Sequence, residues 1–237
     1  MSTPTETWTR HEVVENKALL MTVLVTILVT IGGIVELVPL AAVKSNVPTI
    51  ASVKPYTPLE LEGRDLYLRE GCYNCHSQMI RPLRAETLRY GDYSRPGEFV
   101  YDHPFQWGSK RTGPDLARLG GKYPDAWHYR HMENPASTSP GSIMPRYPWL
   151  LTDALDGSLT AAKLRAMRTL GVPYSDGEIA GAEEARNAQA RAIAGRLGAQ
   201  GVTVAPDREI VAMIAYLQRL GTDWRTAADG ASDAEAP

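Results

Sequence analysis

The sequence predicts a mainly α-helical chain in which a single N-terminal transmembrane helix precedes a soluble domain. Two observations predict this fold class: an uncharged apolar run near the N-terminus, and apolar residues at helical spacing near the C-terminus, while strand patterns are weak throughout. The chain has 237 residues, a formal net charge of -2 and 43% hydrophobic residues. This balance indicates a folded protein and gives no reason to expect a nucleic-acid partner.

The apolar run is long enough to cross a bilayer. Residues 18–35 include no charged side chain, and after Glu36 the apolar sequence continues to residue 43. Because a transmembrane helix needs about 20 mainly apolar residues, we predict one membrane-spanning helix over residues 18–43. The alternative is a cleaved signal peptide, but residues 1–17 are too long and too acidic for its first part.

Two features of this run suggest a partner within the membrane. Thr22, Thr26 and Thr30 fall on one helix face, with Gly33 close to it. Small and hydroxylated residues on one face let another helix approach closely, although threonines also occur scattered in lipid-facing helices. Glu36 is ionisable and lies near membrane depth, where such groups usually face protein or water.

Helical segments are predicted at intervals along the soluble part. We expect an extended linker over 44–57, a domain over 58–221 and a mobile acidic tail over 222–237. The domain's predicted helices cover residues 59–70, 124–133, 159–171, 176–199 and 207–220. Asp207 is the predicted N-cap of the last helix, and the Ala-rich helix before it is polar enough to lie on the surface. Residues 77–112 are predicted to be irregular.

The only two cysteines lie three positions apart, in the segment Gly71-Cys72-Tyr73-Asn74-Cys75-His76. The pattern C-x-x-C-H is the attachment signature of a c-type haem. The two thiols form thioethers with the haem vinyl groups, and the adjacent histidine lies under the iron as the proximal ligand. We therefore predict one covalently bound haem c on Cys72 and Cys75, with His76 as an iron ligand.

Other sites also use a cysteine pair. A thioredoxin-like dithiol needs a βαβ context, which the sequence does not indicate. A zinc site of two cysteines and two histidines would need partners from elsewhere in the chain. His103, His128 and His131 are available for that role, so both alternatives remain open at this point.

The haem iron needs either a sixth ligand or an open position. Three methionines are poor candidates, because they follow the proximal histidine too closely or fall in predicted helices: Met79, Met167 and Met213. Met144 lies well downstream, in a loop where the neighbouring Pro145 can hold it rigidly across the haem face. We predict Met144 as the second iron ligand, with His103, His128 and His131 as the alternatives.

At these residues the sequence resembles a class I cytochrome c module. Gly63 and Tyr67 precede the haem motif as in that family, and AYLQRLG at 215–221 resembles its C-terminal helix. The resemblance implies that these two helices cross near the haem, with the glycine allowing close approach. Gly113-Pro114-Asp115-Leu116 resembles the family's G-P-x-L turn, whose proline carbonyl accepts a hydrogen bond from the proximal histidine and would orient His76.

Compared with a minimal cytochrome, the sequence carries large loop insertions over 77–112 and 155–205. The first is rich in arginines and aromatic residues, which are favoured at protein interfaces and can pair with haem propionates. A structured, solvated loop is equally compatible with this composition. The residues concerned are Arg81, Arg84, Arg89, Arg95, Tyr90, Tyr93, Tyr101 and Trp107.

A more specific resemblance, to the monohaem second subunit of cbb3-type cytochrome c oxidase, extends over about residues 11–221. It is carried by HEVVEN before the anchor, by EGCYNCHSQMIRPLRAETLRYGDY around the haem motif, and by NPASTSPGSIMPRYPWL and MRTLGVPYSDGEIAGA further on. The resemblance implies that Cys72 and Cys75 carry the haem and that His76 and Met144 are its axial pair.

The resemblance also implies a role. The chain would be an electron-transfer subunit of a proton-translocating oxidoreductase, without catalytic residues of its own. It would pass electrons from the dihaem cytochrome c subunit to the haem-copper catalytic subunit, which reduces oxygen to water. Since c-type haem is attached on the periplasmic side in Gram-negative bacteria, residues 44–237 would be periplasmic, residues 1–17 cytoplasmic, and the anchor single-pass in the bacterial inner membrane.

Three other functions remain as alternatives. One is an anchored monohaem cytochrome of another respiratory complex, such as nitric oxide reductase, which would lack the inserted segment rich in arginine and tyrosine. Another is a haem peroxidase or ligand sensor, which needs an open or labile sixth position. The third is a membrane-tethered thiol oxidoreductase, which needs free thiols.

Overall fold

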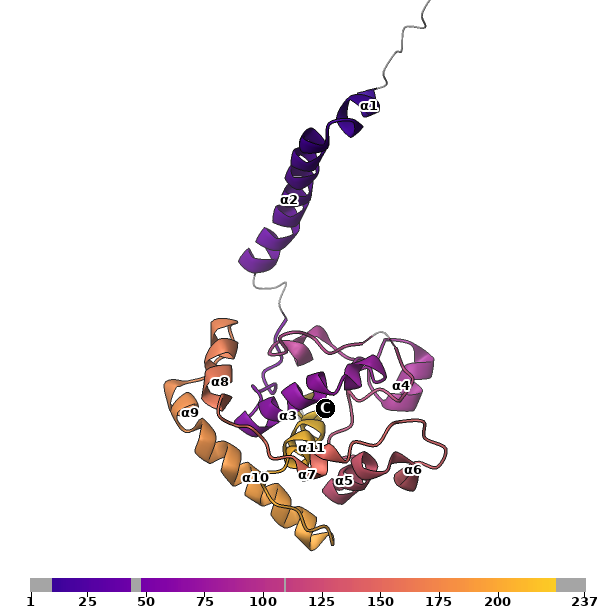
Figure 1. Cartoon of the computed structure of the whole chain (residues 1–237), viewed down its shortest axis with the longest axis vertical. Helices are drawn as coiled ribbons and strands as arrows, with labels where there is room; N and C mark the ends of the chain where they lie inside the picture. Colours follow the sequence, from indigo (N-terminus) through magenta and orange to yellow (C-terminus); the bar gives the residue numbers. More distant parts are fainter. Residues whose placement is uncertain (1–9, 44–47, 109, 225–237) are drawn as a thin grey trace, which may run out of the picture. The chain divides into compact units, whose positions relative to one another are not determined.

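The computed structural model describes residues 10–43, 48–108 and 110–224 (Figure 1). The chain forms two compact units, Met1–Pro48 and Thr49–Pro237. The described residues form helices and no strand, and one isolated bridge joins Ala154 to Arg208. The predicted mainly α fold is therefore confirmed.

The first unit consists of α1 (Arg10–Glu15) and α2 (Ala18–Ala42). Within α2, 23 residues from Ala18 to Leu40 are long and apolar enough to span a membrane. The hydroxyls of Thr22, Thr26 and Thr30 each donate to the carbonyl four residues earlier, at 2.7–2.9 Å. These hydroxyls are satisfied inside the helix, so they do not themselves require a partner helix. Of the predicted N-terminus, residues 1–9 lie outside the described part.

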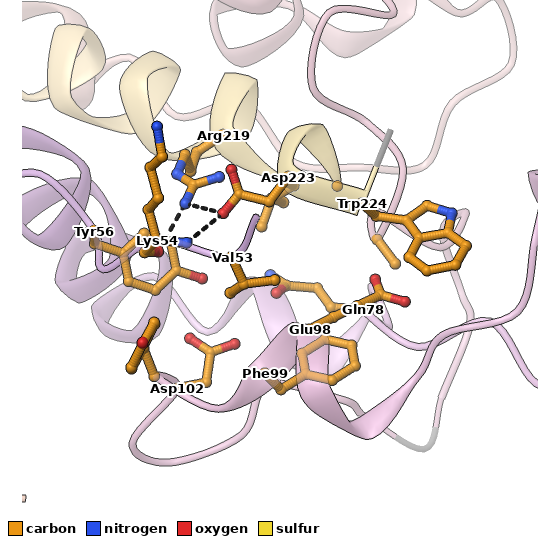
Figure 2. A pocket seen from close by; sticks show the side chains of 14 residues that line it. Val53, Lys54, Tyr56, Gln78, Glu98, Phe99, Asp102, Arg219, Asp223 and Trp224 are labelled. Atoms are coloured by element: carbon orange, nitrogen blue, oxygen red, sulfur yellow. Dashed lines mark hydrogen bonds and ion pairs between the residues drawn. The ribbon is translucent and has the colours of Figure 1, made fainter. Parts of the chain in front are cut away.

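The second half of the predicted linker belongs to the soluble unit, while residues 44–47 lie outside the described residues. Asp223, after the last helix, accepts a hydrogen bond from the Lys54 amide at 2.8 Å, and its carbonyl accepts one from Ser52 at 2.9 Å. Figure 2 shows Lys54, Arg219 and Asp223 together in a pocket that Val53, Phe99 and Trp224 also line. The chain that leaves the first unit is thus fixed to the end of the last helix.

Two crossing helices form the centre of the soluble unit, α3 (Pro58–Arg69) and α11 (Glu209–Arg219) (Figure 1). Thr57 caps α3 in a capping box with Glu60. Every residue of α11 from Glu209 to Leu217 is buried. The main hydrophobic cluster of the unit forms around this crossing.

The predicted N-cap of α11 is wrong. Arg208, not Asp207, stands at the N-cap position, and no side chain caps the helix. The Asp207 carbonyl instead accepts a hydrogen bond from the Leu155 amide at 2.7 Å, and the Glu209 amide donates to the Asp153 carbonyl at 3.1 Å. Pairing with residues 153–155 therefore decides where the helix begins, and tertiary contacts override the local capping preference.

The two inserted segments cover different sides of the crossing (Figure 1). The second one contains α8 (Thr160–Thr169), α9 (Asp176–Ala180) and α10 (Ala182–Ala199). These helices form a second hydrophobic cluster with Leu61 of α3. The predicted surface position of α10 holds only in part, because one side of it is buried through Ala182, Ala190, Ile193 and Leu197.

The first inserted segment contains two short helices, α4 (Arg84–Tyr90) and η3 (Pro96–Phe99), within otherwise irregular chain. A buried ion pair between Arg64 and Asp102, at 3.2 Å, fixes it to α3. The remaining elements are η2 (Cys72–Asn74), α5 (Asp125–Glu133), α6 (Pro135–Thr138) and α7 (Trp149–Thr152).

The packed domain continues past the boundary predicted at residue 221. Trp224 is buried, and the guanidinium of Arg95 lies 4.3 Å from the centre of its indole ring. Residues 225–237 of the predicted tail lie outside the described residues.

Gly63 allows the central crossing. A Cβ atom there would lie 2.0 Å from the Ala212 carbonyl oxygen and 2.8 Å from the Cβ of Tyr216, so any side chain would push α3 and α11 apart. We expect Gly63→Ala to destabilise the soluble unit by about 3 kcal/mol, near the upper end of overpacking costs, and to lower its thermal midpoint.

The matched control is Gly195→Ala on α10, where a Cβ would meet nothing within 4 Å. There the better helix propensity of alanine should leave stability unchanged or raise it by about 1 kcal/mol. Equal thermal midpoints for both variants, measured by circular dichroism, would contradict the close-approach explanation.

Candidate functional site

The C-x-x-C-H motif forms a compact turn directly after α3. Gly71 has φ +68°, a left-handed conformation that favours glycine, and the chain then enters the single turn of η2. The amides of Cys75 and His76 both donate to the Cys72 carbonyl, at 3.1 and 2.9 Å. The turn therefore brings the two cysteines and the histidine together at the end of a buried helix.

The two thiols differ in environment and do not form a disulfide. Cys72 is partly buried and Cys75 is exposed. Burial, with a smaller effect of Glu70, raises the pKa of the Cys72 thiol from 9.0 to about 12. Since dithiol oxidoreductases need a thiolate with a lowered pKa, this environment does not favour redox chemistry at the cysteine pair.

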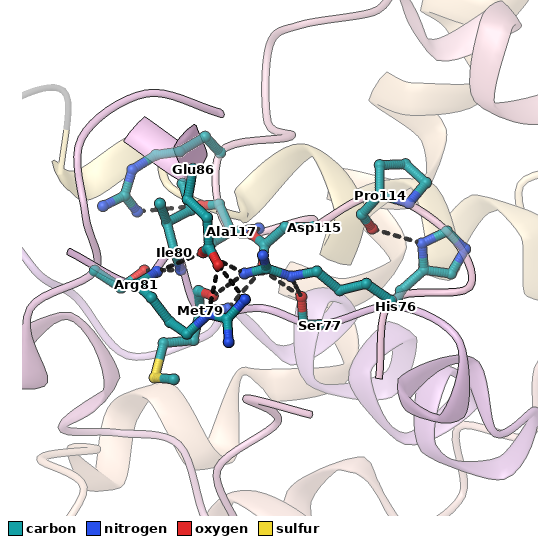
Figure 3. Close-up of polar contacts among 12 residues, drawn as sticks. His76, Ser77, Met79, Ile80, Arg81, Glu86, Pro114, Asp115 and Ala117 are labelled. Carbon is teal, nitrogen blue, oxygen red and sulfur yellow. Dashed lines mark hydrogen bonds and ion pairs between the residues drawn. The ribbon is translucent and has the colours of Figure 1, made fainter. Parts of the chain in front are cut away.

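His76 is held by one side of its ring. Its Nδ1 lies 2.8 Å from the Pro114 carbonyl oxygen (Figure 3), so the hydrogen bond implied by the cytochrome resemblance is present. Because a carbonyl only accepts, Nδ1 donates in this contact, and the other ring nitrogen, Nε2, takes no part in it. The imidazole is thereby prepared to bind a metal through Nε2.

Gly113 provides the space for this ring. A Cβ at Gly113 would lie 2.3 Å from Cε1 of His76 and 2.7 Å from Nδ1. The Gly113 amide also donates to the Cys75 carbonyl at 2.9 Å. The backbone of Gly113 and Pro114 therefore forms a cradle that fits an imidazole and fixes its orientation, which agrees with the role of an axial haem ligand.

Met144 lies in the loop between α6 and α7, partly buried against the main hydrophobic cluster. The helix that follows this loop contacts the haem-motif region through Trp149 of α7, whose indole Nε1 donates to Glu70 at 3.0 Å. Burial, followed by the charges of Cys72 and Cys75, raises the pKa of Tyr147 to about 12. The loop therefore lies near the motif, while ligation of iron by Met144 stays a prediction.

The alternative histidine ligands have other surroundings. His128 is buried, its Nε2 has no hydrogen-bond partner among the residues that the structure describes, and burial lowers its pKa to about 4, so it is neutral. His131 Nδ1 lies 2.7 Å from the Thr138 hydroxyl, and its ring stacks on Trp127 with centroids 4.5 Å apart. Burial and the charge of His76 lower the pKa of His131.

The zinc alternative finds no support within the described ranges. There, no group of three or more His, Cys, Asp or Glu side chains lies close enough together to hold a metal ion. A c-type haem does not need such a group of ligands from this part of the chain. Two thiols attach the porphyrin, and one imidazole binds the iron.

A polar network that the sequence analysis did not identify lies beside the histidine (Figure 3). Asp115 accepts hydrogen bonds from the Ser77 hydroxyl at 2.6 Å and the Met79 amide at 2.9 Å. Arg111 joins this carboxylate to Glu86 of α4, which is also paired with Arg81. Asp115 belongs to the G-P-x-L segment, but no motif indicates its partners, because the three stretches 77–81, 84–90 and 111–115 are brought together only by folding.

The arginines of the first insertion are partly accounted for within the chain. Arg81 pairs with Glu86, and Arg95 lies over the rings of Tyr93 and Trp224. Arg89 lies 5.2 Å from the ring centre of its neighbour Tyr90. These contacts support the structured-loop interpretation for these three arginines, and pairing with haem propionates remains a prediction.

The comparisons with known proteins agree with this site. A family model described as "Cytochrome C oxidase, mono-heme subunit/FixO" matches residues 11–224, which is most of the chain. No curated protein matches the chain.

Glu86 provides a test of the network by pH. Hydrogen bonding to Arg111, assisted by Arg81, lowers its pKa from 4.5 to about 2 although burial opposes the shift. Because the folded pKa lies below the unfolded one, ionised Glu86 stabilises the fold above about pH 4.5, and this contribution is lost as the pH falls towards 2.

We therefore expect Glu86→Gln to lower the thermal midpoint at neutral pH and to differ progressively less from the wild type between pH 4.5 and pH 2. Asp92→Asn, at an exposed position of the same insertion, is the control and should follow the wild type throughout. A Glu86→Gln deficit of constant size down to pH 2 would contradict the proposed charge pairing.

Proposed function

Because the chain belongs to the family of monohaem subunits of cytochrome c oxidase, we propose that it is the electron-transfer subunit of a cbb3-type oxidase, with one haem c bound covalently to Cys72 and Cys75. The observation that carries this proposal is the state of His76. Its Nδ1 is fixed on the Pro114 carbonyl, its Nε2 takes no part in that contact, and two free thiols precede it in one turn.

The bound haem would supply a one-electron iron couple. The residues of the chain orient and enclose it. Cys72 and Cys75 would hold the haem covalently, His76 would bind its iron through the imidazole that Gly113 and Pro114 orient, and Met144 is the proposed second ligand. With two side-chain ligands on the iron, such a haem would transfer electrons and take up neither oxygen nor substrate, so the oxygen-reducing site would belong to another subunit.

The partners follow from this role. We propose that the dihaem cytochrome c subunit of the same complex donates the electron and that the haem-copper catalytic subunit accepts it. The apolar stretch Ala18–Leu40 would anchor the chain in the bacterial inner membrane, with the haem domain in the periplasm. Glu36, within this stretch, would face protein or water rather than lipid.

The family match also weighs against the alternatives. It spans the segment 77–112, which an anchored cytochrome of the nitric oxide reductase type would lack. The raised pKa of Cys72 disfavours a thiol oxidoreductase. A peroxidase or sensor would need an open iron position, and the ligand test below addresses it.

Purification with partners tests the function. From a mild detergent extract, we expect the chain to co-purify with a subunit that contains copper and b-type haem, and to show haem-linked peroxidase staining at 26.0 kDa on a denaturing gel. The stain depends on covalent attachment, so Cys72→Ser and Cys75→Ser together should abolish it. A stained chain without any copper-containing partner would defeat the oxidase assignment and leave the haem assignment intact.

Substitution of Met144 tests the sixth ligand. We expect Met144→Leu to remove the sulfur–iron charge-transfer band. It should also lower the reduction potential, because a methionine ligand favours the reduced iron. Without the methionine, carbon monoxide should bind the reduced haem at the position that the ligand leaves open. Met167→Leu, at a buried methionine of α8 in the second cluster, is the matched control and should retain the wild-type spectrum. An unchanged spectrum in Met144→Leu would transfer the ligand role to a histidine. Rapid, stoichiometric carbon monoxide binding by the wild type would support the sensor alternative.

A further inference from the structure

Two segments of the chain determine where His76 lies. One runs from Cys75 to Met79 and carries the histidine, and the other runs from Gly113 to Ala117 and carries the Pro114 carbonyl. Two backbone hydrogen bonds join them, from the Gly113 amide to the Cys75 carbonyl at 2.9 Å and from the Leu116 amide to the Ser77 carbonyl at 2.8 Å. The His76–Pro114 hydrogen bond is therefore sensitive to the relative position of these two segments.

A buried carboxylate reinforces the same junction. The Asp115 side chain has no exposed surface and accepts three neutral hydrogen bonds, from the Ser77 hydroxyl, the Met79 amide and the Ala117 amide, at 2.6, 2.9 and 2.8 Å. Two of these donors belong to the histidine's segment and one to its own. A buried carboxylate is costly unless it is both hydrogen-bonded and balanced in charge.

Arg111 supplies the balancing charge. One Nη lies 3.5 Å from the Asp115 carboxylate, and the same nitrogen donates to the Met79 carbonyl at 2.8 Å. Its Nε donates to the Ser77 hydroxyl at 2.7 Å. A planar guanidinium can hold these partners at once in a fixed geometry, whereas an ammonium on a flexible stem cannot.

The inserted helix α4 completes the network. Glu86 accepts from Arg111 at 2.7 Å and pairs with Arg81, so two arginines face two carboxylates. The ring of Tyr90, also on α4, lies 5.4 Å from the Arg111 guanidinium. The helix α4 thus holds the same Nη nitrogen of Arg111 that donates to the histidine's segment.

We propose that Arg111 is a positioning residue for the axial ligand His76. It acts through Ser77 and Asp115 to keep the histidine's segment in register with Pro114, and it thereby sets the geometry of the Nδ1 hydrogen bond and the orientation of the imidazole. The proposal rests on the proposed function, in which His76 binds the haem iron. It also assigns a role to α4, which the minimal cytochrome pattern lacks.

The test uses the full haem-loaded chain in detergent. Arg111→Lys retains the charge but loses the planar fork, and Arg111→Met loses both. Arg84→Met removes an equivalent charge from an exposed position of α4 and serves as the control. The measurements are the electron paramagnetic resonance g-values of the oxidised haem, which report axial ligand geometry, the reduction potential and the thermal midpoint.

We expect altered g-values, or a second low-spin signal, in both Arg111 variants, with wild-type g-values in Arg84→Met. Ser77→Ala, which removes only the shared hydroxyl, should alter the g-values in the same direction by a smaller amount, and it provides the answer if the Arg111 variants do not fold. Because Arg111→Lys keeps the charge, its altered g-values would show that hydrogen-bond geometry matters beyond the charge itself.

Three results would overturn the proposal. Wild-type g-values in both Arg111 variants with only a lower thermal midpoint would indicate a merely structural residue. A shifted potential in Arg111→Met alone, again with wild-type g-values, would indicate an electrostatic effect alone. A wild-type chain without a low-spin haem signal would overturn the proposed function itself, which distinguishes the two failures.

Discussion

The hydrogen bond from His76 to the Pro114 carbonyl is the contact on which the arrangement of the site depends. It joins residues that lie 38 positions apart, so the chain between them must leave the haem motif and return to within 2.8 Å of it. A bond from Nε2 to a metal would leave rotation about that bond undetermined, so such a bond would not by itself orient the imidazole. The second ring nitrogen removes this freedom, and the precision of the ligand is therefore set by the backbone that carries Pro114.

Because the Pro114 carbonyl must be held against His76, both the haem motif and the chain that returns to it need packed neighbours. On one side, the crossing of α3 and α11 places the end of α3, and with it Cys72, relative to the core, and Tyr216 of α11 contacts Gln78 after the motif at 3.0 Å. On the other side, the Asp115–Arg111 network holds the returning chain. The first insertion is therefore part of the support of the site, since α4 and the Arg64–Asp102 pair give the returning segment fixed neighbours.

The sequence was sufficient for the parts of the site that are contiguous or that belong to a known pattern. The anchor length, the C-x-x-C-H turn, the Gly63 crossing and the Pro114 acceptor were all predicted, and the structure shows the last two as contacts. Asp207 was misassigned because pairing with residues 153–155 decides the start of α11. The roles of Arg111 and Glu86 could not be predicted, since three separate segments meet there and any exposed loop could carry the same residues. The buried side of α10 was missed because small alanines give it little hydrophobic contrast.

A rigid, prearranged ligand has a physical consequence for electron transfer. When a metal centre changes its charge, any polar group that can reorient will do so, and this reorganisation slows the transfer. The polar network beside His76 has little freedom to respond, because the Asp115 carboxylate is fully buried and accepts from three neutral donors, and Arg111 donates to both Ser77 and Glu86. Its two arginines and two carboxylates also balance in charge. In the proposed function, this rigidity would favour the repeated gain and loss of one electron over the binding of a substrate, which would require the surrounding chain to move.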